Sequence, residues 1–235
     1  MVLRYETLYK AVLENRMIKG FLRAIPGLDD YSMLGKAWWH TTETDAAGRL
    51  KYDLVVLDAP ATGHAVTMLR LPQAILDTVP EGPLTKTARR VRELLTDASQ
   101  CAMLLVTLAE DLPAAEAIDL HRQNERLLKI PLGAVVVNQL WPGDFDGGGS
   151  IYGVLERSGC AHADPVLEPL CERARITHAR RQINEHYLEV LRQEIPAPLL
   201  RLPLLFRPTF GVAELDEIVD LIGTQLPPAD GNDSG

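Results

Sequence analysis

An acid, a glycine and a histidine follow a short apolar run in the segment 53–72, which reads DLVVLDAPATGHAVTMLRLP. Asp58 comes directly after the run, and a carboxylate at the end of a buried strand can hold a magnesium ion through water. Gly63 can bring a backbone N–H close to a phosphate because it has no Cβ to block the approach. Thr62 and His64 can orient a water molecule or a switch segment. The same letters also fit a simpler interpretation, in which Asp58 is the N-cap of a helix and His64 is a residue satisfied nearby.

Two further apolar runs end in polar residues. Asn138 and Gln139 follow GAVVV, and an asparagine offers both a donor and an acceptor, which suits the edge of a purine ring. Taken alone, an asparagine at this place is also an ordinary turn residue. Glu110 and Asp111, in TLAEDLPAAEA, open a predicted helix, where acids complement the helix dipole as readily as they do chemistry.

The usual phosphate-binding loop is missing from this sequence. A P-loop requires G-x-x-x-x-G-K-[ST], because its backbone amides and its lysine cradle the phosphates. No glycine of the chain begins this pattern, and the one Gly-Lys pair, Gly35-Lys36, is followed by Ala37. The sequence therefore offers candidates for a metal-linked acid and a base-binding amide, without the loop that usually joins them.

The elements that must position these residues are predicted from hydrophobic patterning. Unbroken apolar runs at 54–57, 102–108, 132–137 and 199–205 are typical of parallel strands that helices cover on both faces. The segments between them, 73–96, 113–129 and 164–194, are long enough for crossover helices. Helical periodicity also marks 8–25 and 31–40. We therefore predict an α/β fold, a doubly wound, mostly parallel sheet with flanking helices. The predicted organisation is a helical segment over 1–50, an α/β core over 51–226 and a disordered tail over 227–235.

Composition narrows the class of protein. The chain has 235 residues, is 46% apolar and carries a formal net charge of −8, which is typical of a globular protein and argues against nucleic acid as the main partner. No apolar run approaches the roughly 20 residues that span a bilayer. Charges occupy the N-terminal segment where a signal peptide is apolar, and three scattered cysteines make no disulfide framework. We expect a cytoplasmic protein.

Taken in order, the strand ends resemble those of the ArsA-type ATPases, the arsenite-pump ATPase and its relatives that target tail-anchored proteins. The matching segments cover most of the chain from about 15 to 222. They are NRMIKGFLRAIPGLDDYSMLGKAWW, DLVVLDAPATGH, LRLPQAILDTVPEGPLTKTARRVRELLTD, LLVTLAEDLPAAEA, GAVVVNQLWP and RLPLLFRPTFGVAELDEI. Their ordered occurrence is more specific than any one of them, and the bacterial ArsA-like branch is the nearest likeness. The resemblance implies a P-loop NTPase-like fold that binds ATP and Mg²⁺.

The resemblance also implies roles for single residues. Asp58 corresponds to the acid that helps to position Mg²⁺ or the attacking water. The segment 59–64 corresponds to the part that responds to the γ-phosphate, with Gly63 as its phosphate-sensing amide. Asn138, followed by Gln139, corresponds to the asparagine that recognises adenine. The segment 203–208, with Pro203 and Leu205 as candidate contacts, corresponds to the loop that closes over the base.

The resemblance implies partners as well. In the family, nucleotide switches a homodimer between open and closed forms, and a hydrophobic helical region, here including residues 1–50, handles a protein cargo or membrane partner. The family's first strand, P-loop and first switch are expected before Met1, so we expect this chain alone to hydrolyse ATP poorly. Three hypotheses follow: an ArsA-like ATPase whose N-terminal part is elsewhere, an inactive paralogue that binds and regulates an intact ArsA-like ATPase, and an unrelated α/β enzyme.

Overall fold

The computed structural model describes residues 28–142, 153 and 168–226, and the chain divides into two units. The first unit contains the residues up to Met103 together with Leu120–Pro131, and the second contains Leu104–Asp119 together with the residues from Leu132 onward. Each unit is described by itself. The predicted helix at 8–25, most of the loop at 141–150 and the tail at 227–235 lie outside the described residues.

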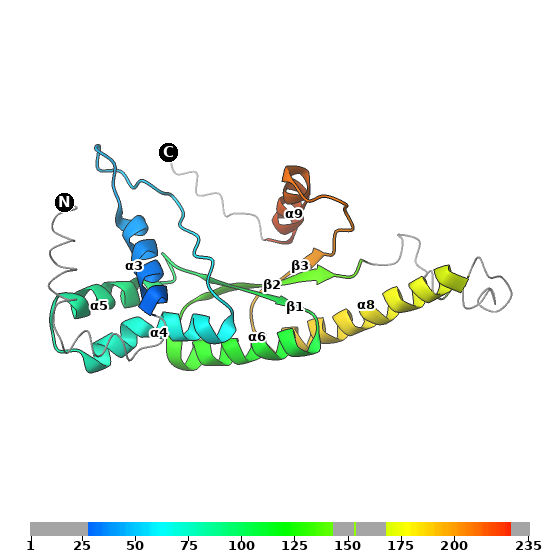
Figure 1. The fold of residues 1–235 in the computed structure, drawn as a ribbon, viewed down its shortest axis with the longest axis horizontal. Helices are drawn as coiled ribbons and strands as arrows, with labels where there is room; N and C mark the ends of the chain where they lie inside the picture. The colour runs from blue at the N-terminus through cyan, green and yellow to red at the C-terminus, as the bar shows by residue number, and fades with distance from the viewer. Residues whose placement is uncertain (1–27, 143–152, 154–167, 227–235) are drawn as a thin grey trace. The chain divides into compact units, whose positions relative to one another are not determined.

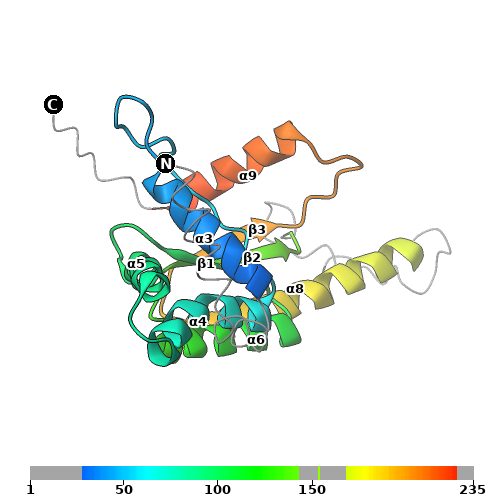
Figure 2. The ribbon, with the colours of Figure 1, turned by 60° about the vertical axis from the view of Figure 1, so that its left-hand side comes forward.

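The first unit is helical in its described part. Helices α3 (Leu28–Thr42), α4 (Thr62–Thr78) and α5 (Pro83–Thr96) pack together (Figure 2), and η1 (Asn124–Leu128) packs against α4. Their shared core is a cluster of buried apolar side chains: Leu34, Val91, Leu95, Leu128 and Ile130. The segment 73–96 contains parts of two helices because Pro80 and Gly82-Pro83 interrupt the pattern between them.

The predicted strand at 54–57 is wrong. Residues 53–61 form no regular element, and the side chains of Leu54 and Val56 are 78% and 81% exposed. An apolar run becomes a strand only where a neighbour accepts and donates its backbone hydrogen bonds. No residue in the part of the chain that the structure describes pairs with this run, so it lies outside the sheet.

The second unit contains a three-stranded parallel sheet, which confirms the predicted α/β fold. Its strands are β1 (Met103–Leu108), β2 (Leu132–Leu140) and β3 (Leu199–Pro203), in the order β1-β2-β3. Helix α9 (Val212–Gln225) packs on one face, against Ala134, Val136, Leu200 and Leu202. Helix α8 (Glu168–Glu194) lies on the opposite face (Figure 1), and α6 (Asp111–Gln123) follows β1.

The two outer strands of this sheet, β3 and β1, differ in how far the rest of the described chain covers them. On β3, the side-chain amide of Gln225 accepts a hydrogen bond from the Arg201 N–H (2.8 Å) and donates one to the Arg201 carbonyl (3.0 Å). On β1, one face remains uncovered, because Leu104 and Val106 are 61% and 65% exposed. Among the described residues, β1 has a hydrogen-bonded neighbour only on the β2 side.

Candidate functional site

The first turn of α4 holds three of the residues predicted from the sequence: Thr62, Gly63 and His64. Ala61 is the N-cap, no side chain caps the helix, and no acid lies in the first turn. The alternative in which Asp58 caps this helix is therefore not what the structure has. The His64 N–H donates to the Ala61 carbonyl at 3.0 Å, whereas the Gly63 N–H lies too near the start of the helix to have a helical acceptor, and the dipole favours an anion beside it. This end of α4 therefore retains its attraction for an anion.

The side chains at this turn leave room for a ligand. Asp58 and His64 are exposed, and a Cβ built on Gly63 meets no atom within 4 Å. Packing within the described protein therefore does not require glycine at position 63. Among the described residues, no group of three or more histidine, cysteine or acidic side chains is placed to hold a metal ion. A single carboxylate such as Asp58 still fits magnesium, which keeps several waters and commonly takes its other ligands from phosphates.

A bulge lies at the carboxyl end of β2, where the sequence predicts a base-binding asparagine. Val137 pairs with Arg201 and Leu140 with Pro203, so β2 advances three residues while β3 advances two. The extra residue is accommodated at Asn138–Gln139, and Gln139 has a φ of 55°, which is uncommon for a residue with a side chain. The Asn138 Oδ1 accepts a hydrogen bond from the Gln139 N–H at 2.8 Å. Bulges often re-aim side chains next to binding sites.

A pocket of about 250 Å³ opens at the carboxyl ends of the strands in the second unit. This volume is just below the roughly 300–1,000 Å³ of sites for drug-sized ligands, which suits one ring system better than a whole nucleotide. Nine residues line it: Leu108, Ala109, Glu110, Asn138, Gln139, Trp141, Arg180, Asn184 and Leu204.

The predicted 203–208 loop adjoins this pocket. Leu204, between Pro203 and Leu205, lines it, and the Leu204 N–H donates to the Leu140 carbonyl at 2.7 Å. The Phe206 ring meets the Trp141 ring edge to face, with 5.6 Å between centroids. The structure thus brings Asn138 and Gln139 together with this loop, whereas Asp58, Thr62, Gly63 and His64 belong to the other unit.

Sequence reasoning missed three of the lining residues: Trp141, Arg180 and Asn184. The Arg180 Nη1 lies 3.7 Å from the Glu110 Oε1, a loose pair between half-exposed side chains. Asn184 is buried, in a stripe that continues through Leu188 and Leu191 at helical spacing. A polar residue within an apolar stripe was the signal in the sequence that marks this position, because burial of an amide requires hydrogen-bond partners.

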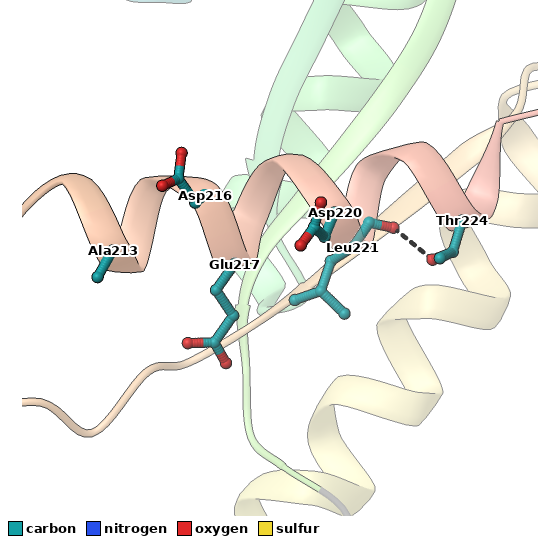
Figure 3. A pocket seen from close by; sticks show the side chains of 6 residues that line it. All are labelled: Ala213, Asp216, Glu217, Asp220, Leu221 and Thr224. Atoms are coloured by element: carbon teal, nitrogen blue, oxygen red, sulfur yellow. Dashed lines mark hydrogen bonds between the residues drawn. The ribbon is translucent and has the colours of Figure 1, made fainter.

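A second, shallow depression lies along α9 and is less suited to a nucleotide. All six residues that line it come from this one helix, and three are acids: Asp216, Glu217 and Asp220 (Figure 3). Their charge opposes a phosphate. In the parts that the structure describes, no helix is long and apolar enough to cross a membrane.

Comparisons with known proteins agree with the resemblance. Residues 2–86 match the family model described as "Anion-transporting ATPase". The chain is 32% identical over 121 residues to "Putative ATPase Mb3704" of Mycobacterium bovis and, with the same values, to "ATPase BagA" of Mycobacterium tuberculosis. Each match covers 52% of this chain and 35% of the relative, so the shared region spans about a third of the relatives' length. The match to the anion-transporting ATPase family covers residues 2–86 of the 235 residues, and this part of the chain is similar to that family.

Proposed function

We propose that this chain binds an adenine nucleotide, and that the pocket of the second unit takes the base. For the first unit, considered by itself, we propose that the turn that begins α4 responds to phosphate. The observation that carries the proposal is the bulge at Asn138–Gln139, because it lies at the pocket where the family resemblance expects base recognition. Ligands of parallel α/β sheets bind outside the carboxyl ends of the strands, which is where this pocket opens.

The amide of Asn138 has the chemistry to recognise adenine. The Gln139 N–H uses one lone pair of the Oδ1 and holds the amide in a defined orientation. By the inventory of an amide, a second lone pair and two N–H donors remain. Adenine presents a donor amino group next to a ring nitrogen acceptor, so one amide satisfies both. Guanine presents an acceptor oxygen at the same place, which this arrangement disfavours.

The turn that begins α4 is proposed to respond to the phosphates. The uncapped first turn supports this role, and the open space at Gly63 allows a phosphate to approach the backbone. Asp58 would hold Mg²⁺ through water, and the ion, when bound, neutralises charge on the phosphates. His64 and Thr62 are proposed to orient the switch segment.

Hydrolysis by this chain alone is expected to be poor. The sequence contains no G-x-x-x-x-G-K-[ST], and the P-loop supplies most of the phosphate binding and transition-state stabilisation in such enzymes. The same observation favours a second function, that of an inactive ArsA-like paralogue that regulates an intact ATPase. In both cases we propose a dimer, with a second copy or with the intact partner. We further propose cytoplasmic action on a protein cargo or membrane partner.

Titration with a fluorescent ATP analogue tests the proposal, with and without an intact ArsA-like ATPase. We expect binding that unlabelled ATP displaces better than GTP. Asn138→Ala is expected to weaken ATP binding about tenfold, which corresponds to one hydrogen-bonding partner worth about 1.4 kcal/mol, and to remove the preference over GTP. Gln193→Ala is the matched control, since this exposed amide on α8 donates to a neighbouring glutamate, Glu189, and does not line the pocket. Absence of binding, or equal loss in both variants, would refute the proposal.

A further inference from the structure

Asn184 is a polar residue on the buried side of helix α8, where apolar side chains are expected. It is 5% exposed and shares the buried side of α8 with Leu188 and Leu191. Burial of an unpaired amide is costly, so a buried asparagine requires hydrogen-bond partners that an apolar residue would not need.

Both hydrogen bonds of Asn184 reach the backbone at strand exits. The Nδ2 donates to the carbonyl of Ala109, directly after β1, at 2.9 Å. The Oδ1 accepts from the N–H of Trp141, directly after β2, at 2.9 Å. These partners lie 75 and 43 residues away in sequence, and both line the same pocket as Asn184. One side chain therefore connects the two neighbouring strand exits that form the pocket wall.

The geometry points to Asn184 as a positioning residue that fixes the separation of the β1 and β2 exits and thereby the orientation of the Asn138 amide toward the base. This inference rests on the proposed function. The Trp141 N–H lies three residues after Asn138, so holding it limits how far the bulge can shift. Without the Asn184 amide, the β1 and β2 exits can move independently of each other. The pocket then loses its selectivity for one purine while the unit is still folded.

Asn124 provides a matched control. It is also a buried asparagine, 4% exposed, and it also bonds twice to backbone: its Nδ2 donates to the Ile130 carbonyl at 2.8 Å and its Oδ1 accepts from the Ile130 N–H at 3.1 Å. It does not line the pocket. Asn184→Ala and Asn124→Ala therefore remove the same groups from similarly buried sites, one at the pocket and one outside it.

The experiment is competition of ATP and GTP against the fluorescent ATP analogue, on the full chain and both variants, each checked for cooperative unfolding. We expect Asn184→Ala to weaken ATP binding about tenfold and to reduce the preference for ATP over GTP by a similar factor. Asn124→Ala should leave both within about twofold, even if it lowers the melting temperature as much. A folded Asn184→Ala chain with wild-type affinity and preference, or an equal loss in Asn124→Ala, would overturn the positioning role while leaving the proposed function intact. Absence of binding by the wild type would overturn both.

Asn184→Asp adds a second measurement, the pH dependence of ATP binding, which a purely structural role of Asn184 would not change. The aspartate keeps the acceptor for the Trp141 N–H, but its ionised form places a second oxygen against the Ala109 carbonyl. Protonation restores a donor, so ATP binding by this variant should recover at acid pH relative to wild type. The ionisable residues that line the pocket are Glu110 and Arg180, and Asp111 interacts with Tyr187 of the same helix as Asn184. All four are present in both proteins, so the wild-type pH profile accounts for them. A variant that folds at acid pH without recovering affinity would contradict the role of the donor.

Discussion

Substitution of Gly63 by alanine separates stability from phosphate sensing. Gly63 is the second residue of α4, and a Cβ there meets no atom within 4 Å. Alanine is better than glycine in a helix by roughly 0.5–1 kcal/mol, and for a chain of this size 1 kcal/mol moves the melting temperature by roughly 2–4 °C. We therefore expect Gly63→Ala to raise the melting temperature of the nucleotide-free chain by about 1–4 °C.

The same methyl group should weaken binding of the phosphates. Alanine keeps the N–H at position 63, but its Cβ would block the close approach of a phosphate to that N–H. Loss of this hydrogen bond to a charged group costs about 1.5–3 kcal/mol, which is roughly tenfold or more in affinity. Adenosine, which has no phosphate, should bind Gly63→Ala as it binds the wild type. Differential scanning fluorimetry and competition titrations with ATP and adenosine measure the two effects separately.

Gly35→Ala is the control for this prediction, because Gly35 also lies in a helix, α3, with nothing within 4 Å of its Cβ position. It should be stabilised to a similar degree or more, with unchanged ATP binding. A destabilised Gly63→Ala chain would refute the open geometry of the turn. A stabilised chain that binds ATP as tightly as the wild type would refute the approach of a phosphate to Gly63.

Three further predictions concern other parts of the chain. With Mg²⁺ and ATP, the purified chain should show no appreciable turnover in a phosphate-release assay; robust turnover that Asp58→Asn abolishes would contradict this. Light scattering should show self-association of the chain, and Val106→Lys should lower it, since Val106 lies on an uncovered edge strand. Val219→Lys changes an equally exposed site on α9 and should have little effect. Equal effects of the two variants would argue against self-association through the β1 edge. The hydrogen bond from Lys51 and that with His40 hold the pKa of Glu43 below its ordinary value, so their stabilisation is present above that value and is lost as pH falls through the lowered pKa. The Lys51 N–H donates to the Glu43 carbonyl, so its protection from amide exchange, measured relative to the intrinsic rate at each pH, should fall in this acid range. Glu43→Gln should remove the change, and unchanged protection would contradict the pairing.

The sheet of the second unit was predictable because its strands carry their signal locally. The apolar runs at 102–108, 132–137 and 199–205 became β1, β2 and β3, each with β-branched or leucine side chains suited to burial. The run at 54–57 has the same composition, but its state depends on a partner for its backbone, which composition does not report. Hydrophobic patterning therefore predicted the three paired strands correctly and the run at 54–57 wrongly.

The candidate site was predictable only in part, for a related reason. Asn138 is visible as an amide after an apolar run, but the bulge beside it depends on the register between β2 and β3, more than 50 residues apart. Asn184 is visible as an amide within an apolar helical stripe, but its partners at Ala109 and Trp141 come from two other elements. A single sequence shows which residues can bond, and the fold decides with which others.

The side-chain amide of Gln225 affects which edge of the sheet can pair with a further strand. A side-chain amide has the same donor and acceptor as a peptide group, so by bonding to both polar groups of Arg201 it takes the place that one residue of a further strand would take. The β3 edge is thereby closed to extension by a residue of α9, the helix that also covers the sheet. Within the described chain, the β1 edge has no such substitute. We therefore expect a further strand that enlarges this sheet to join beside β1 more readily than beside β3.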